Sequence, residues 1–371
     1  MRNLASIQKI TDIRPIPDAD QIEVARVLGW EVVVRKAENH QIGDSVVYIE
    51  VDSVLPDKPE FEFMCERKFR VKTIKLRKQI SQGLVFPLSV LPQKKYREGD
   101  DVTNIIGVTK YDPEAIAENL VCKRQQQKTL IGKLLYRFAW YRKYFCKRGG
   151  KEKFPRGIHK TDEIRIQSCP SVLDYHRGES FYVTEKLDGQ SATYFINKKD
   201  FGICSRNFIV TVPDSSSYWR VAKKYNMKDI LIDAQKEYGV DLALQGENVG
   251  YGVENSVWFA SRDHHKANIY NLTDNYFFLF NVWDITHQKF FTIQEMIEFV
   301  NKYGLRTVPI INSDLKLDFT VNELISASNI QSTLNGATPI EGLVFRENNK
   351  TGFDRCSFKV INNEFLLKYG L

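Results

Sequence analysis

A strongly basic segment separates two parts of this chain that differ in sequence texture. Residues 121–160 contain 13 Lys and Arg side chains and a single acidic one, Glu152, so this segment carries a net +12. The whole 371-residue chain carries +7, which leaves the remainder net acidic at −5. Charge concentrated in this way favours an anionic partner. We therefore predict a domain at residues 1–110, a basic linker at 111–158 and a second domain at 159–371.

The first 110 residues have the pattern of a series of short strands. Runs rich in β-branched residues lie at Ile22–Val27, Trp30–Arg35 and 45–51, with turn signals between them. Strands spaced in this way are typical of a small barrel or sandwich. A partly open five-stranded barrel of the oligonucleotide-binding (OB) type fits this length.

From position 181 onward the sequence predicts a mixture of strands and helices, that is, an α+β domain. The predicted strands are 181–185, 191–196, 242–247, 277–283, 341–346 and 355–359, and the predicted helices are 217–225, 228–238, 292–303 and 320–330. The helix at 292 has the clearest start, because Thr292 followed by Glu295 forms a capping box.

Composition argues against several classes of protein. The six cysteines form no Cys-x-x-Cys pair and the histidines no His-x3-His pattern, which disfavours a structural zinc site and a disulfide framework. Reduced thiols suggest an intracellular protein, cytoplasmic or nuclear. The first 15 residues lack the apolar core of a secretory signal, and no apolar run is long enough to span a membrane.

The segment most informative about chemistry is Lys186-Leu187-Asp188-Gly189. A lysine ends an apolar strand, an acid follows two positions later, and a glycine permits a tight turn. In an extended chain Lys186 and Asp188 point to the same face, which places an ammonium beside a carboxylate. Such a tetrapeptide alone is common at exposed turns, so its surroundings decide its meaning.

Those surroundings form an ordered string. It consists of Ser205-Arg206-Asn207, Gln245-Gly246-Glu247, Phe278-Leu279-Phe280, Glu341-Gly342-Leu343-Val344-Phe345-Arg346 and Ser357-Phe358-Lys359. With Lys-x-Asp-Gly at its head, this string resembles the covalent nucleotidyltransferase superfamily of polynucleotide ligases and RNA capping enzymes. The resemblance covers residues 160–371. It implies a nucleotidyltransferase (ATP-grasp-like ligase) domain built from antiparallel sheets and helices.

Further segments are similar to ATP-dependent RNA ligases that carry an N-terminal OB module. They are residues 4–10, residues 68–74 together with 79–84, and residues 160–167, which lie just before the strand that carries the lysine. The resemblance fades over residues 100–158. It implies an enzyme that joins RNA 3′-OH and 5′-phosphate ends, at a nicked duplex or at free ends, in RNA repair or nick sealing. We expect a monomer whose partners are RNA and ATP.

By this resemblance Lys186 is the catalytic nucleophile, which attacks ATP to give a lysyl-AMP. AMP then passes to the RNA 5′-phosphate, and the 3′-OH expels it. An amine must be neutral to attack, and the pKa of a free lysine is about 10.4. The site must therefore lower this pKa or remove the proton. A divalent metal and neighbouring cations act in that direction, whereas Asp188 alone acts in the opposite one.

The resemblance also assigns the remaining site residues. Three acids would form an oxygen-rich site for Mg²⁺ or Mn²⁺, and two of them, with six other residues, would line the nucleotide pocket. The predicted metal site consists of Asp188, Glu247 and Glu341. The predicted nucleotide pocket consists of Glu185 (through its backbone), Lys186, Arg165, Arg206, Glu247, Phe280 (stacked on adenine), Glu341 and Lys359. Arg165 and Lys359 would hold the triphosphate, and Arg206 the ribose or nucleic acid.

Two positions depart from the family pattern. The position five after Lys186 is Ser191, where some relatives have Asn. Relatives often carry a second lysine two residues before the late one, where this chain has Ser357. Lys368 is a candidate substitute for it.

Three alternatives compete with an RNA ligase. DNA ligases and capping enzymes usually append a barrel after the shared string, whereas here 12 residues follow Lys359 and the additional module stands in front. This order favours an RNA ligase over both. A non-catalytic RNA-binding protein on a ligase scaffold is disfavoured because Lys186 and all three acids are present.

Overall fold

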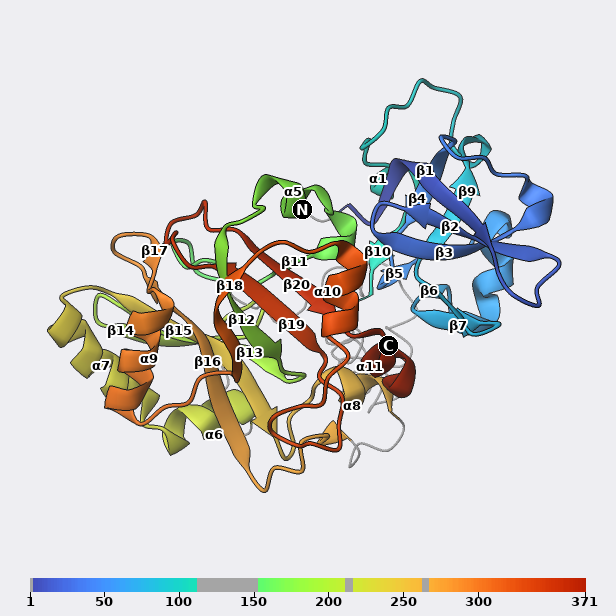
Figure 1. Ribbon diagram of the computed structural model, residues 1–371. Helices are drawn as coiled ribbons and strands as arrows, with labels where there is room; N and C mark the ends of the chain where they lie inside the picture. Colours follow the sequence, from blue (N-terminus) through green and yellow to red (C-terminus); the bar gives the residue numbers. More distant parts are fainter. Residues whose placement is uncertain (1–2, 112–152, 211–215, 262–266) are drawn as a thin grey trace, which may run out of the picture.

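The computed structural model describes residues 3–111, 153–210, 216–261 and 267–371. These residues form an N-terminal part and a larger C-terminal part that lie side by side (Figure 1). Most of the predicted linker at 111–158 lies outside the described residues. None of the helices in the described part of the chain is long and apolar enough to cross a membrane.

The N-terminal part is built on one five-stranded antiparallel sheet with the strand order β3-β2-β1-β4-β9. Its strands are β1 (Ala5–Pro15), β2 (Ile22–Val27), β3 (Trp30–Arg35), β4 (Ser45–Ile49) and β9 (Leu84–Pro87). The edge strands β3 and β9 approach each other, so the sheet curls into an incompletely closed barrel. This confirms the prediction of an OB-type module.

This sheet buries both faces because its side chains alternate. On β4, Val47 and Ile49 enter one apolar core, whereas Val46 and Tyr48 enter the other. Short elements close the module: β5 (Ser53–Val54), β6 (Arg70–Val71), β7 (Ile74–Leu76), β8 (Gln79–Ser81), β10 (Thr109–Lys110), α1 (Thr103–Ile106) and the 3₁₀ turns η1 (Lys36–Glu38), η2 (Pro59–Arg67) and η3 (Leu88–Val90). Val108 belongs to this core, so the module extends almost to residue 110.

The C-terminal part contains two five-stranded sheets that face one groove. The first has the order β11-β20-β19-β12-β18, with β11 (Ile164–Arg165), β12 (Ser180–Lys186), β18 (Ile310–Lys316), β19 (Gly342–Glu347) and β20 (Ser357–Ile361). The second has the order β14-β13-β15-β16-β17, with β13 (Gln190–Asn197), β14 (Asp200–Cys204), β15 (Leu242–Gly250), β16 (Asn275–Asp284) and β17 (Lys289–Phe290). The chain crosses from the first sheet to the second between Lys186 and Gln190, so the Lys-x-Asp-Gly segment joins the two sheets.

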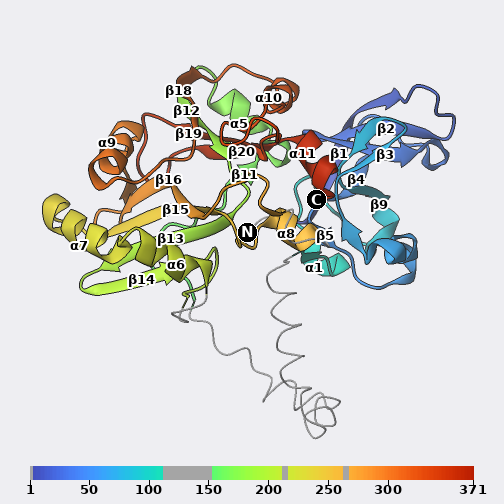
Figure 2. The same ribbon diagram turned by 90° about the horizontal axis from the view of Figure 1, so that it is seen from below.

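Helices cover the outer faces of both sheets (Figures 1 and 2). The second sheet is covered by α6 (Ser217–Lys224), α7 (Met227–Tyr238) and α9 (Ile293–Tyr303), and the first by α5 (Ser171–Tyr175), α10 (Val321–Ala327) and the turn η4 (Ile166–Ser168). The short helices α8 (Ser256–Ala260) and α11 (Asn363–Tyr369) lie near the N-terminal part (Figure 2). The predicted capping box is present at α9, where Thr292 and Glu295 satisfy each other's backbone groups.

Several elements of this domain were not predicted, among them the strands β14 and β17 and the short helices α5, α8 and α11. The edge strand β18 was not predicted, because most of its residues are exposed and it lacks an apolar run. Residues 153–158, which the prediction assigned to the linker, pack on the second sheet. Ile158 is buried against Trp283 of β16, whose indole N–H donates to the Gly157 carbonyl at 2.9 Å.

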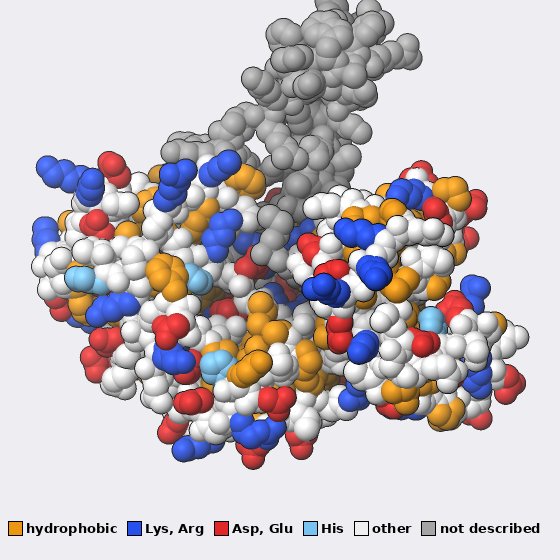
Figure 3. Space-filling model, turned by 90° about the horizontal axis from the view of Figure 1, so that it is seen from above, with side chains coloured by type: hydrophobic (Ala, Val, Ile, Leu, Met, Phe, Trp, Pro, Cys, Tyr) orange, Lys and Arg blue, Asp and Glu red, His pale blue; other side chains and the backbone are white. Residues whose placement is uncertain are grey.

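The two parts of the molecule touch through β11 and the turn that follows it. The Gly29 N–H donates to the Gln167 carbonyl at 2.9 Å, and a Cβ on Gly29 would lie 2.9 Å from the Gln167 Cα. Glycine therefore permits this close approach. Lys72 Nζ also donates to the Gly370 carbonyl at 3.4 Å. The surface is hollowed between the two parts, and both cationic and acidic side chains lie in the hollow (Figure 3).

Candidate active site

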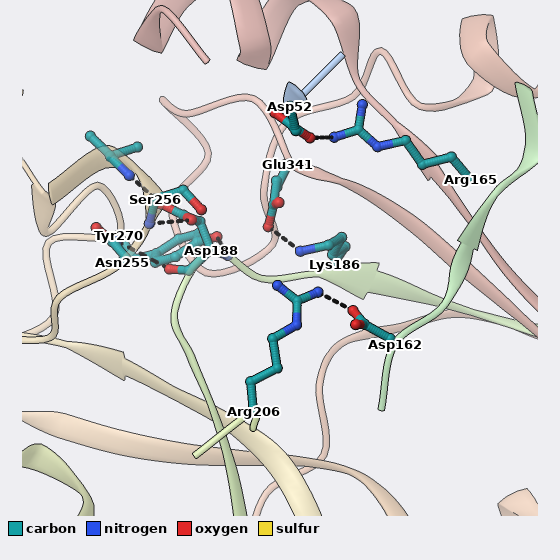
Figure 4. Close-up of polar contacts among 11 residues, drawn as sticks. Asp52, Asp162, Arg165, Lys186, Asp188, Arg206, Asn255, Ser256, Tyr270 and Glu341 are labelled. Atoms are coloured by element: carbon teal, nitrogen blue, oxygen red, sulfur yellow. Dashed lines mark hydrogen bonds and ion pairs between the residues drawn. The ribbon is translucent and has the colours of Figure 1, made fainter. Parts of the chain in front are cut away.

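Lys186 ends β12 at the crossover between the sheets. Its Nζ donates to Oε2 of Glu341 at 2.6 Å, and the Lys186 side chain is 26% exposed (Figure 4). Burial alone would lower the pKa of this ammonium, but three neighbouring carboxylates outweigh burial and raise it. Those carboxylates belong to Glu341, Glu247 and Asp188. The three acids of the predicted metal site therefore all act on the predicted nucleophile.

The acids also repel one another. Burial, with smaller contributions from Glu341 and Asp188, raises the pKa of Glu247 to about 8, although Lys186 opposes the shift. Burial and then Glu341 raise the pKa of Asp188 to about 7. Crowded carboxylates with raised pKa values are stabilised by a bound cation, so this side of the groove is suited to one.

Asp188 is tied to helix α8. The backbone N–H of Ser256 donates to its Oδ1 at 3.0 Å and that of Val257 to its Oδ2 at 3.3 Å. Asn255 Nδ2 donates to the Asp188 carbonyl at 3.2 Å, and the Asp188 N–H donates to the Tyr270 hydroxyl at 2.8 Å. The carboxylate therefore meets the positive end of a short helix. Each of its oxygens keeps a lone pair for a further donor, such as a water.

Gly189 lets the crossover pack against β15. A Cβ at this position would lie 2.3 Å from the Asn248 carbonyl oxygen and 2.7 Å from the Glu247 Cγ. Any other residue would push the turn away from β15. The glycine of the motif is therefore what brings Glu247 close to Lys186.

A cationic cluster faces the acids. Burial first, and then the neighbouring cations Arg206, Lys186 and Arg165, lower the pKa of Lys359 to about 7. Lys359 lies opposite Arg165 where β11 and β20 pair in parallel. Arg206 forms an ion pair with Asp162, and although burial opposes it, Arg206 and Lys359 hold the pKa of Asp162 below its usual range. Cations crowded to this degree suit a phosphate ligand.

Arg165 is paired across the domain boundary. Its Nη2 lies 2.5 Å from Oδ2 of Asp52 in the N-terminal part, and its guanidinium carbon lies 6.0 Å from the Trp30 ring centroid (Figure 4). Its Nε is buried without a partner. The residue predicted to hold the triphosphate is thus held by the OB module in this structure.

Phe280 is half-buried on β16, beside a buried arginine. The Arg346 guanidinium carbon lies 5.2 Å from the Phe280 ring centroid, and Arg346 is 2% exposed. Arg346 donates to the Thr184 hydroxyl at 3.2 Å and pairs with Glu163 at 3.3 Å. The ring predicted to stack on adenine therefore lies against a cation that is itself fixed in place.

Glu185 is buried, and its side chain is committed to the fold. The Ser332 hydroxyl donates to its Oε1 at 2.5 Å, and the Thr333 backbone N–H donates to its Oε2 at 3.1 Å. Burial raises the pKa of Glu185. Its carboxylate anchors the loop after α10, and the contact of its backbone with adenine stays a prediction.

The two residues considered for the missing second lysine differ in position. Ser357 lines the groove side of β20 and its hydroxyl donates to Glu163. Lys368 is exposed on α11, with its Nζ 5.3 Å from the Tyr369 ring centroid. No contact among the described residues connects Lys368 to the groove.

Comparison with known families now assigns these two parts. Residues 4–88 match the model of an OB-fold domain, and residues 179–361, which carry the crossover, the acids and Lys359, match the model of the RNA ligase family. The chain belongs to the RNA ligase family. No curated protein sequence matches it.

Solved structures extend this RNA ligase assignment over the whole chain. The RNA ligase of Naegleria gruberi with pyrophosphate is 29% identical, covering 99% of this chain and 98% of that one, with a TM-score of 0.78. A variant with AMP and Mn is 29% identical over 98% of each chain, with a TM-score of 0.78. Another variant, with ATP and Mn, has the same identity and coverage and a TM-score of 0.77.

The acids of this RNA ligase fit a hydrated metal better than a dehydrated one. Among the described residues, no three His, Cys, Asp or Glu side chains gather closely enough to ligate an ion directly. The acids around Lys186 nevertheless raise one another's pKa values, which marks a place where a positive charge is favourable. Mg²⁺ keeps several of its waters in proteins, so carboxylates at this spacing suit its hydration shell.

Sequence reasoning missed several residues of this RNA ligase groove. Asn255 carried a signal, because Asn before a short apolar run is a helix N-cap, and its side chain does accept from the Trp258 N–H. Arg346 ends the Glu-Gly string and could have been read as part of it. Asp52 and Tyr270 carried none, because their roles arise only from tertiary contacts.

Proposed function

We propose that this RNA ligase is ATP-dependent and seals RNA through a lysyl-AMP on Lys186. The observation that carries the proposal is the position of Lys186 at the crossover, 2.6 Å from Glu341, with the cations Arg206 and Lys359 close enough to perturb one another. The acids on one side of the groove suit a metal ion, which would also be the counterion of the leaving pyrophosphate. The cations on the other side suit the triphosphate of ATP.

The chemistry follows from what each group holds. Nζ of Lys186 attacks the α-phosphorus of ATP, a P–N bond forms, and the P–O bond to pyrophosphate breaks. An oxygen of the RNA 5′-phosphate then displaces the lysine to form a pyrophosphate-linked adenylate. Finally the 3′-OH attacks the RNA phosphorus and AMP departs. Arg165, Arg206 and Lys359 would balance the negative charge that builds up on the phosphates.

The proton on Lys186 explains why a divalent cation belongs to this proposal. The acids raise the pKa of Lys186, which is the wrong direction for a nucleophile. Mg²⁺ or Mn²⁺, when bound beside Glu341, Glu247 and Asp188, would supply positive charge that offsets those carboxylates. Solved structures of the Naegleria enzyme with ATP and Mn, and with AMP and Mn, support ATP and a divalent metal as its ligands.

The decisive experiment is incubation with ATP and Mg²⁺ followed by mass spectrometry of the intact protein and its peptides. We expect a single AMP adduct on Lys186, labile to acid, and none on K186A. The matched control is K302A, because Lys302 is an exposed lysine paired with Glu237 on α7, far from the groove. An adduct on K186A, or on another lysine of the wild type, would refute the assignment.

A second assay addresses the RNA substrate and the role in repair. We propose that nicked duplex RNA is sealed, because the RNA ligase domain carries an additional OB module beside its groove. Duplexes with RNA or DNA on each side of the nick, and single strands with free ends, should be compared at one salt concentration. Sealing of free ends alone would contradict a role at nicks.

A further inference from the structure

A small pocket opens beside the groove, next to the cationic cluster. Residues that line it include Lys160, Thr161, Asn281, Phe353, Arg355 and Ser357. They come from the stretch before β11, from β16, and from the turn that leads into β20. None of these residues was assigned a role by the sequence string except Ser357, which was noted as the missing lysine.

The strands lead directly from the cationic cluster to this pocket. Ser357 precedes Lys359 by two residues on β20, and Glu163, which also lines the pocket, precedes Arg165 by two residues. Two residues along a strand cover about 7 Å and return to the same face. The pocket therefore lies one step along the groove from the predicted phosphate-binding residues, on the same face.

Arg355 is a cation of this pocket that has no anionic partner among the described residues. Its guanidinium carbon lies 3.5 Å from the Phe290 ring centroid, and it donates to Asn281 Oδ1 at 3.0 Å and to the Tyr182 hydroxyl at 3.4 Å. Both acceptors are neutral, and Nε is buried without a partner. No carboxylate in the described part of the chain lies within ion-pair distance of Arg355.

Nearby charges do not supply the missing anion. The Glu163 carboxylate is engaged by Arg346 at 3.3 Å and by the Ser357 hydroxyl. Burial lowers the pKa of Arg355 and Arg346 adds to the effect, whereas Tyr182 and Glu163 oppose this shift without reversing it. A desolvated guanidinium with neutral partners is costly unless an anion binds it, so the pocket is arranged for an anionic ligand.

An exposed aromatic ring forms the lip of the pocket. Phe353 is 64% exposed, and its ring centroid lies 5.8 Å from that of His159 and 5.2 Å from that of Trp283. A large apolar side chain exposed beside cations is the arrangement on which proteins stack the bases of single-stranded nucleic acid. A free phosphate or the end of a triphosphate would use the cations but not this ring.

We propose that this pocket binds a nucleotide of the RNA substrate, with Arg355 and Lys160 on its phosphate and its base stacked on Phe353. Lys368 is exposed on α11 and does not line this pocket. The inference rests on the proposed RNA ligase function.

The first test separates RNA from ATP as the ligand. R355Q is expected to raise KM for a nicked RNA about tenfold, with the rate of lysyl-AMP formation within about twofold of wild type. R355K should recover part of the loss. The salt slope of RNA binding should weaken by roughly one phosphate contact, about 0.7–0.9 in log–log units. K368Q is the matched control and should leave sealing unchanged.

The second test avoids a buried residue. Phe353 is exposed, so F353A should not perturb folding, and a fewfold rise in KM for sealing of a pre-adenylylated nick is expected. F353Y should restore stacking, whereas F353L should not. Y175A is the control, because Tyr175 is 83% exposed on α5.

Three outcomes would overturn the inference. If lysyl-AMP formation falls as much as sealing in R355Q, the pocket serves ATP. If F353A and R355Q bind RNA as wild type does, no nucleotide occupies it. If F353L behaves like F353Y, the ring acts by packing rather than stacking. Failure of the wild type to form lysyl-AMP would instead refute the proposed function, and direct titration with RNA would still test the pocket.

Discussion

Two lysines of the same groove have opposite electrostatic surroundings. Lys186, on the acidic side, has its pKa raised by three carboxylates, whereas Lys359, on the basic side, has its pKa lowered to about 7 by burial and neighbouring cations. Judged by pKa alone, Lys359 would be the better nucleophile at neutral pH. Geometry points the other way, because only Lys186 lies at the sheet crossover beside the acids. The groove therefore has charges complementary to its predicted ligands before they bind: negative charge for a metal on one side, and positive charge for phosphate on the other.

The largest expected effect comes from removing the acid that contacts Lys186. Glu341 accepts from Lys186 at 2.6 Å, so E341Q should lower the pKa of Lys186 and yet reduce lysyl-AMP formation by about 10²–10³-fold, because a charge that favours the metal is lost. Single-turnover rates against pH should show a profile displaced to lower pH. A rate near that of wild type would mean that Glu341 only raises the pKa of Lys186 and does not help to bind the metal.

Removing the opposite lysine should have a smaller effect on the same step. K359A is expected to raise KM for ATP and slow lysyl-AMP formation by about 10–100-fold, because one phosphate contact is lost while Arg165 and Arg206 remain. The adduct should still map to Lys186. Peptide mapping of wild-type protein that placed AMP on Lys359 would reverse the comparison.

The lowered pKa of Lys359 predicts a pH dependence of phosphate binding. Above about pH 7 the free amine is mostly neutral, so binding an anion must take up a proton, and affinity for pyrophosphate should fall as pH rises from 7 to 9. One coupled proton limits the slope to about tenfold per pH unit. K359R should flatten this slope, because arginine stays charged. The groups that face Lys359 are Arg206, Lys186, Arg165 and Asp162.

Calorimetric titration of wild-type protein and K359R with pyrophosphate at several pH values provides the measurement. If affinity changes with pH equally in the two proteins, the effect belongs to pyrophosphate itself.

The acidic side should respond to pH in the opposite sense. The pKa values of Asp188 and Glu247, raised to about 7 and about 8, mean that these carboxyls are partly protonated at neutral pH without a metal. Mg²⁺ affinity should therefore rise between pH 6 and 8, with up to about tenfold per unit for each proton released. Titration in buffers of different ionisation enthalpy counts those protons. A metal affinity that is constant over this range would contradict the crowding of the acids.

The smallest expected effect concerns the contact between domains. D52N should leave the fold intact and change KM for ATP only about two- to threefold, because the ion pair with Arg165 is partly exposed and short-range. The direction is informative: a lower KM means that Asp52 competes with the triphosphate, and a higher one means that it orients Arg165. D174N is a suitable control, since Asp174 pairs with the exposed Arg177 on the surface.

The sequence allowed most of this architecture to be predicted where local pattern sufficed. Strands with apolar runs, such as β12 and β15, and the capped helix α9 lie close to their predicted positions. The string of motifs also identified residues that meet in one groove although 155 residues separate Lys186 from Glu341. What it could not supply depends on tertiary contact. Nothing near Asp188 indicates that its carboxylate meets the N-terminus of α8, and nothing near Arg165 indicates Asp52.

The contact between Arg165 and Asp52 gives the OB module a part in the timing of the reaction. If Arg165 binds the triphosphate as predicted, the Asp52 carboxylate competes with the triphosphate for the same guanidinium, both before ATP binds and after pyrophosphate leaves. Competition from Asp52 would weaken the binding of both ATP and pyrophosphate. It would help most at the release of pyrophosphate, where a tightly bound leaving group would slow the enzyme. Arg165 lies in register with Lys359 on the neighbouring strand, so the Asp52 contact also lies one strand away from the lysine that is predicted to bind phosphate. The OB module thereby reaches the predicted phosphate-binding residues through a single side chain, although its own strands carry none of them.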